Sequence, residues 1–79
     1  MQRFFLHIRA ADGWTEDPEG IELANLDAAR DEAQAGLRHL MADHLRSGRP
    51  LYVQQIEITD LTGQLLATVT YKDALEALQ

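Results

Sequence analysis

The sequence contains no cysteine and only two prolines among its 79 residues. Without cysteine the chain forms no disulfide and no thiolate metal site, and it has no thiol nucleophile. Its apolar runs are only a few residues long, which excludes a membrane-spanning helix, and the apolar start is too short for a signal peptide. We therefore expect a cytoplasmic protein with no contact to a membrane.

Basic residues are also scarce, because seven Lys and Arg stand against 13 Asp and Glu, a formal net charge of −6. Non-specific affinity for nucleic acid depends almost entirely on Lys and Arg, so we expect no direct nucleic-acid binding. An acidic surface is better suited to a basic protein partner or a cation.

The apolar fraction is ordinary for a globular protein, at 46% of the residues, and the length allows one domain over residues 1–79. A core of this size seldom supplies more than about 3–5 kcal/mol of net stability. Because no disulfide is available, we expect self-association, most simply as a homodimer, to supplement the core.

Alternation of apolar and polar residues predicts an antiparallel sheet of three to four strands. A short return strand is expected after Asp12-Gly13, a dipeptide favoured in tight hairpins. The predicted strands cover residues 3–9, 14–16, 51–59 and 64–70, with 21–23 as a further short extended piece.

Helical spacing of apolar residues predicts one long helix between Asn25, an expected N-cap, and Gly48, an expected left-handed C-cap. A short last helix should begin after Thr70, whose spacing from Asp73 resembles a capping box. Together these elements predict a two-layer α+β domain with the long helix packed on one face of the sheet.

One helix covers only one face of a sheet, so the other face is expected to meet a second molecule. The alternation places Leu65 on the helix side, together with Phe4, Leu6, Ile8, Ile56, Ile58 and Val69. The candidate interaction surface comprises residues of the other face together with the nearby Trp14, which is either a lid on the core edge or an anchor for a partner. Its members are Phe5, His7, Trp14, Val53, Glu57 and Leu66.

Candidate chemistry is limited to His7 and Glu57, which become cross-strand neighbours if their strands pair. Such a pair could do acid–base work, whereas the structural interpretation is a polar contact on the sheet or at a dimer seam. His39 and His44 are five residues apart, which is not the spacing of two metal ligands on one helix face. Because phosphate-binding glycine motifs, nucleophile elbows and zinc spacings are absent from the sequence, we expect no enzyme, cofactor or metal.

Four segments together resemble a family of short uncharacterised bacterial proteins with a domain of unknown function. They are Phe4-Phe5-Leu6-His7-Ile8, Asp17-x-Glu19-Gly20-x-Glu22-Leu23, Leu26-x-x-Ala29-Arg30-x-Glu32-Ala33 and Ile56-Glu57-Ile58-x-Asp60. Ala24-Asn25 stands where a Pro-Asp pair is usual in that family. A more distant likeness, in arrangement and turn residues, is to HicB-type antitoxin domains, which implies an acidic domain that masks a basic ribonuclease.

Three functions follow from these observations as hypotheses. The first is a non-enzymatic domain that self-associates and acts by protein–protein contact. The second is an antitoxin-like or regulatory subunit for a basic protein partner. The third is a small-ligand binding protein or enzyme centred on His7 and Glu57, which requires an enclosed pocket lined by both.

Overall fold

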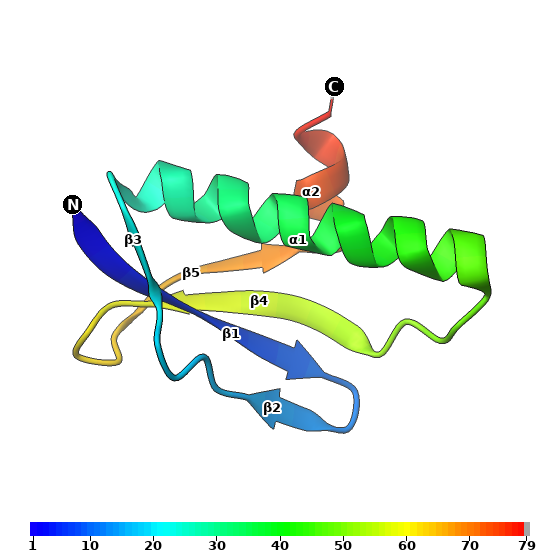
Figure 1. Ribbon diagram of the computed structural model, residues 1–79, viewed down its shortest axis with the longest axis horizontal. Helices are drawn as coiled ribbons and strands as arrows, with labels where there is room; N and C mark the ends of the chain where they lie inside the picture. Colours follow the sequence, from blue (N-terminus) through cyan, green and yellow to red (C-terminus); the bar gives the residue numbers. More distant parts are fainter. Residues whose placement is uncertain (79) are drawn as a thin grey trace.

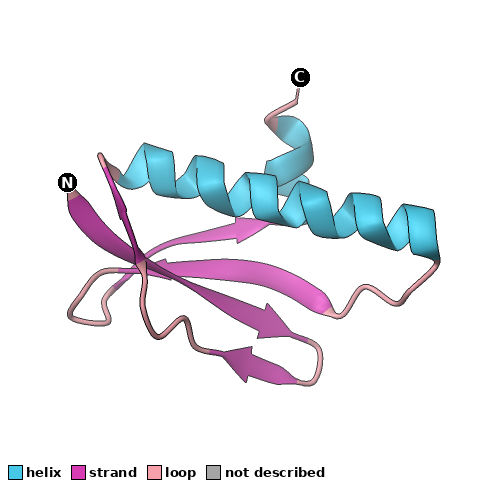
Figure 2. Cartoon of the chain, in the orientation of Figure 1, coloured by secondary structure: helices cyan, strands magenta, loops and turns pink. Residues whose placement is uncertain are grey.

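The computed structural model describes residues 1–78, in which five strands form an open antiparallel sheet accompanied by two helices. Figure 1 shows α1 running along one side of the sheet, and α2 following the end of β5 near the C-terminus. Figure 2 shows the same arrangement by type of element, and the predicted α+β class is confirmed. The elements are β1 (Gln2–Ala10), β2 (Gly13–Thr15), β3 (Ile21–Leu23), α1 (Leu26–Ser47), β4 (Val53–Thr59), β5 (Leu65–Thr70) and α2 (Tyr71–Glu76).

The sheet has five strands rather than the three to four predicted. Its order is β2-β1-β4-β5, and β3 also pairs with β1. The nine residues of β1 are long enough for two short partners, so β2 pairs with Ile8–Ala10 and β3 with Gln2–Phe4. The extended piece at 21–23 is therefore a full member of the sheet.

The predicted ends of the helices are confirmed by their capping contacts. Asn25 accepts the N–H of Ala28 at 2.8 Å, and Gly48 has a left-handed φ of 74° and donates its N–H to the carbonyl of His44. Thr70 and Asp73 form the expected capping box of α2. These side chains satisfy amides that a helix end leaves without partners.

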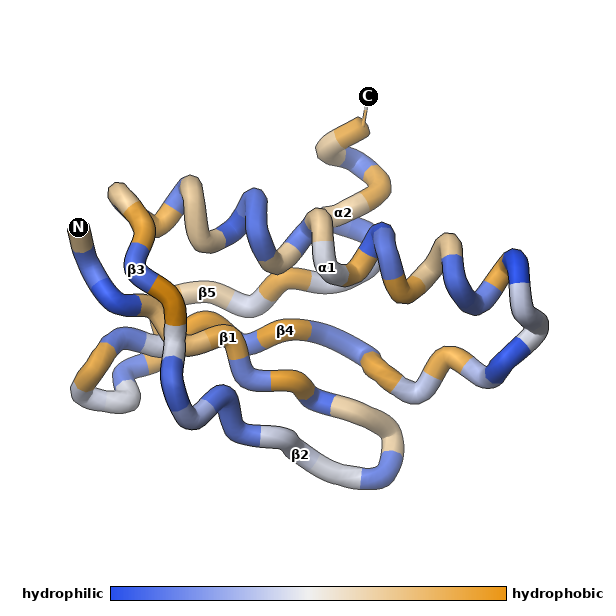
Figure 3. The backbone as a smooth tube through the Cα atoms, viewed as in Figure 1, coloured by the Kyte–Doolittle hydropathy of each residue, from blue (hydrophilic) through white to orange (hydrophobic). Residues whose placement is uncertain are grey.

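The core lies between α1 and the facing side of the sheet. Phe4, Leu37 and Ile58 are its largest fully buried side chains, and small alanines of α1 let the helix approach the strands. Figure 3 shows hydrophobic and hydrophilic bands alternating along α1, as an amphipathic helix requires. The buried apolar residues are Phe4, Ala29, Ala33, Leu37, Ile56, Ile58, Val69 and Ala74.

Two shifts in strand pairing correct the predicted faces of Val53, Leu65 and Leu66. The pairing shifts by one residue beside Ala10 and again beside Thr59. An extra residue in one strand moves the alternation by one place, so side chains beyond it change faces. Val53 and Leu66 consequently pack against the buried core, whereas Leu65 pairs with Thr59 and is 56% exposed.

The molecule is a thin slab, because its Cα atoms extend over 37 × 31 × 16 Å. This thickness corresponds to one sheet layer and one helix layer. The sheet face turned away from α1 therefore has no helix over it within residues 1–78. Neither helix described has the length and apolar character that crossing a bilayer requires.

Candidate functional site

The face of the sheet away from α1, called the open face below, carries the candidate residues of β1. Phe5 pairs with Thr59 of β4 in the register, and His7 pairs with Glu57. The structure thus brings His7 and Glu57 side by side, which the sequence could propose only on condition that these two strands pair.

The His7 ring does not reach Glu57, because both ring nitrogens are bonded elsewhere. Nδ1 accepts the backbone N–H of Asp17 at 2.9 Å, and Nε2 lies 3.0 Å from Oγ1 of Thr59. A ring that accepts at Nδ1 carries its proton on Nε2, so His7 is the neutral tautomer that donates to Thr59. With 7% of its surface exposed, His7 is buried and fully hydrogen-bonded.

Glu57 is likewise fully engaged with other side chains. Arg9 donates to its two carboxylate oxygens from Nε at 3.1 Å and from a terminal nitrogen at 3.3 Å, and Gln55 donates at 3.0 Å. These contacts hold the pKa of Glu57 below its ordinary value, with Arg9 as the largest cause and Gln55 next. The proposed acid–base pair is not formed, and the cavity of about 130 Å³ beside His7 is not lined by Glu57.

The sequence did not single out Asp17 as a site residue, although this residue organises the loop over His7. Its Oδ2 accepts the N–H of Leu6 at 3.1 Å, and its Oδ1 accepts the N–H groups of Gly20 at 3.1 Å and Glu19 at 3.3 Å. Burial raises the pKa of Asp17, but these backbone bonds outweigh it and hold the pKa below its ordinary value. The Asp-Pro-x-Gly sequence predicts the turn, but it gives no sign of the contact with β1.

Three rings lie next to one another on the open face. Phe5 and His7 are stacked with centroids 6.3 Å apart, and the ring of Trp14 lies 4.9 Å from His7 at 43°. Trp14 covers the histidine, yet 46% of its own surface remains exposed. Trp14 therefore meets the description of a lid, and it also offers an exposed, positioned aromatic surface.

Two leucines extend the apolar part of this face beyond Phe5. Leu65 lies in the same register row as Phe5, because both residues pair with Thr59. Leu61, in the connection between β4 and β5, is 76% exposed and lines the small cavity together with Phe5. The alternation pattern missed Leu65 because the pairing shift beside Thr59 is not visible in the sequence.

The histidines of α1 do not assemble with His7. His44 donates from Nδ1 to the carbonyl of Arg49, a residue just beyond the end of α1. Within residues 1–78, no group of three His, Asp or Glu side chains is placed so that it could hold a metal ion.

The fold and the open face define a two-layer α+β domain with a hydrogen-bonded histidine between two aromatic rings. The chain belongs to the family described as Domain of unknown function (DUF6894), whose model matches residues 3–72. A search of the curated proteins found no match, and neither did a search of the solved structures. The likeness to a domain of unknown function is thereby confirmed, while the likeness to HicB-type antitoxins stays a prediction.

Proposed function

We propose that this chain is a non-enzymatic domain that acts by protein–protein contact and self-associates through its open face. The observation that carries the proposal is the position of Trp14. This ring is held against His7, whose two nitrogens are fixed by Asp17 and Thr59, and almost half of it is exposed. Exposed, preorganised aromatic rings are the residues that most often dominate the binding energy of interfaces.

The charged and titratable side chains around Trp14 are paired within the chain. Arg9 and Glu57 neutralise each other within the chain, and His7 is bonded as the neutral tautomer. The part of the open face around Trp14 therefore adds little to the repulsion between two copies, and the carboxylates of Glu16, Asp17 and Asp60 lie around the small cavity beside His7. The acidic residues Asp12 and Glu19 are exposed in the connections beside β2 and β3, where a basic partner would bind instead.

The small size of the domain supports the same conclusion. The sheet buries apolar side chains on the side of α1, whereas Trp14, Leu61 and Leu65 keep 46%, 76% and 56% of their surfaces exposed. Packing these side chains against a second molecule would remove apolar area from water and add to the stability of a domain with a small core.

Light scattering coupled to gel filtration tests the proposal from micromolar to submillimolar concentration. We expect the mass of the wild-type protein to rise above 8.9 kDa with concentration. The Trp14→Ser variant should have a lower mass than wild type at every concentration at which the wild-type protein is assembled. Leu45→Ser is the matched control, because Leu45 is 75% exposed on α1, which packs on the other side of the sheet, and its variant should behave as wild type.

Fluorescence provides an independent measurement, since Trp14 is the only tryptophan in the sequence. Dilution of the wild-type protein should shift the emission of Trp14 to longer wavelength as the ring returns to water. A mass that stays at 8.9 kDa up to submillimolar concentration, with an emission that dilution does not change, would show the proposal to be wrong.

A further inference from the structure

The two edges of the sheet are built differently. The edge formed by β2 and β3 consists of two three-residue strands, and exposed acidic residues such as Asp12, Glu16 and Glu22 lie in or beside them. The other edge is β5, whose six residues Leu65–Thr70 include no charged residue, no proline and no glycine. Natural sheets blunt exposed edges with charges, proline or short strands, and β5 has none of these features.

The direction of the backbone groups of β5 follows from the register. The N–H of Leu6 bonds to Asp17 and so points away from β4; its neighbours on β1 point toward β4. Leu6 pairs with Ile58 of β4, so the N–H and C=O of Ile58 point away from β1 and toward β5. Ala67 and Val69 pair with Ile58 and Ile56, and their N–H and C=O groups therefore point toward β4. The N–H and C=O of Thr68 point outward, away from every strand of the chain that the structure describes.

Thr70 supports this assignment at the end of the strand. Its N–H also points outward by the same alternation, and it bonds to the carboxylate of Asp73 at 2.9 Å instead of to a strand. The capping box therefore occupies the outward N–H of Thr70, whereas the outward groups of Thr68 stay available for pairing with another strand.

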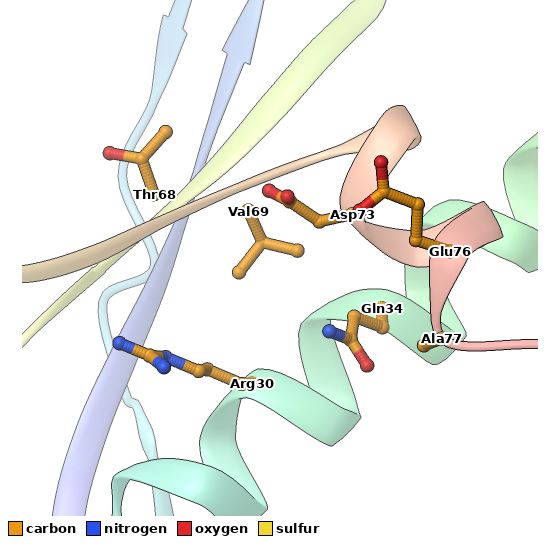
Figure 4. A pocket seen from close by; sticks show the side chains of 7 residues that line it. All are labelled: Arg30, Gln34, Thr68, Val69, Asp73, Glu76 and Ala77. Carbon is orange, nitrogen blue, oxygen red and sulfur yellow. The ribbon is translucent and has the colours of Figure 1, made fainter.

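A groove of about 550 Å³ runs beside this edge, between β5 and the two helices. Figure 4 shows Arg30 and Gln34 on α1, Asp73 and Glu76 on α2, and Val69 on β5 with its side chain toward α1. Charges of both signs therefore flank the open edge. Such a mixed surface is complementary to a copy of itself, because either sign can meet its opposite on the second molecule.

We infer that the edge of β5 pairs antiparallel with β5 of a second copy, about a two-fold axis beside Thr68. Thr68 is exposed, so water can satisfy its outward N–H and C=O, but an exposed edge of this kind is also a template on which the backbone of another strand can pair. The edge formed by β2 and β3 of a second copy is short and acidic, so β5 is the strand that a copy can offer. In this pairing Thr68 faces itself, so the N–H of each Thr68 donates to the carbonyl of the other.

The β5 contact is a surface distinct from the open face, so the inference goes beyond the proposed function. A chain with two self-complementary contacts assembles beyond a dimer. We therefore expect the wild-type mass to exceed twice 8.9 kDa at submillimolar concentration, and each single contact to support a dimer alone.

Two variants at Thr68 distinguish the contribution of its backbone N–H to the β5 contact from that of its side chain. Thr68→Pro removes the outward N–H, and proline is accepted on edge strands where no ladder bond is lost. Thr68→Ala removes the side chain but keeps the N–H, so it is the matched control. Light scattering should show wild-type mass for Thr68→Ala, a dimer for Thr68→Pro, and a monomer when Thr68→Pro is combined with Trp14→Ser.

Amide exchange measured by NMR on the wild-type protein tests the same contact without a variant. The Thr68 amide should exchange by about tenfold more slowly in the assembled protein than after dilution to the monomer. Free exchange of the Thr68 amide in the assembled protein, or equal masses for Thr68→Pro and Thr68→Ala, would overturn the β5 contact. If Thr68→Pro alone gives a monomer and Trp14→Ser keeps the wild-type mass, the proposed open-face contact is the one that fails.

Discussion

The backbone N–H of Asp17 donates to Nδ1 of His7, and the carboxylate of Asp17 accepts the N–H of Leu6, the residue before His7. Asp17 is thus bonded both to the backbone of β1 and to the ring of His7. The N–H of Leu6 lies between the segments of β1 that pair with β2 and β3, where no strand can accept it. The Asp17 carboxylate accepts this N–H in place of a strand, and it thereby holds the loop at residues 17–20 against β1.

Asp17→Ala should lower the free energy of unfolding by about 2–3 kcal/mol, because hydrogen bonds to a charged acceptor are stronger than neutral ones. The substitution leaves the N–H groups of Leu6, Glu19 and Gly20 without their acceptor. Urea unfolding measures the change. Glu19→Ala is the control in the same loop: Glu19 is exposed, and we expect a change within about 0.5 kcal/mol. Equal effects of the two substitutions would contradict this role of Asp17.

The depressed pKa of Asp17 predicts a dependence of stability on pH. In the unfolded chain an aspartate titrates near its ordinary value of about 3.9, so the folded state binds the proton less tightly than the unfolded state. The stabilisation by the Asp17 carboxylate is therefore complete above that value, and it is lost as the pH falls through the lower folded pKa.

Urea unfolding of wild type and Asp17→Asn, between neutral pH and about pH 3, isolates this contribution. Glu57, Asp60 and Asp73 also have lowered pKa values, so both proteins should lose stability in acid. The difference between the two proteins should be largest near neutral pH and should shrink in acid. A difference that stays constant over the whole range would exclude Asp17 as its source.

The helices and most of the strands could be predicted from the sequence, because a helix cap or an alternation of apolar and polar residues depends only on residues close together in the chain. Asn25 and Gly48 mark the ends of α1 in the sequence as they do in the structure. The pairing shifts beside Ala10 and Thr59 depend on how two distant segments align, and they reversed the faces of Val53 and Leu66. The residues next to Ala10 and Thr59 in the sequence do not indicate such a shift.

The candidate site could be predicted only in part for the same reason. Phe5, His7 and Glu57 were placed on one face by alternation, and the register confirms this placement. The sequence does not predict the hydrogen-bond partners of His7, because Thr59 and Asp17 approach its ring from separate segments of the chain. His7 and Glu57 do not bond to each other as the sequence suggested: His7 bonds to Asp17 and Thr59, and Glu57 bonds to Arg9 and Gln55.

Tyr71→Phe tests a polar atom that the fold leaves unsatisfied. The hydroxyl of Tyr71 is buried and has no hydrogen-bond partner among residues 1–78, and burial raises its pKa. Removing this hydroxyl should leave the free energy of unfolding unchanged or increase it by up to about 1 kcal/mol. Tyr52→Phe, at a side chain that is 60% exposed, should change it by less than about 0.5 kcal/mol. A clear loss of stability in Tyr71→Phe would mean that the hydroxyl is bonded in solution.

Gly36, inside the long helix, and Gly20, in the Asp-Pro-x-Gly turn, should respond to alanine with opposite signs. At Gly36, in the middle of α1, a Cβ would lie 3.9 Å from Cδ1 of Ile56, an ordinary contact, so Gly36→Ala should stabilise the protein by about 0.5–1 kcal/mol. At Gly20, φ is +70° and a Cβ would lie 2.7 Å from the carbonyl oxygen of Phe4. Gly20→Ala should therefore destabilise it by at least about 2 kcal/mol, through strain and displacement of the β1–β3 pairing. Urea unfolding of both variants measures the signs, and a loss of stability in Gly36→Ala would show that α1 packs closer to β4 than the structure has it.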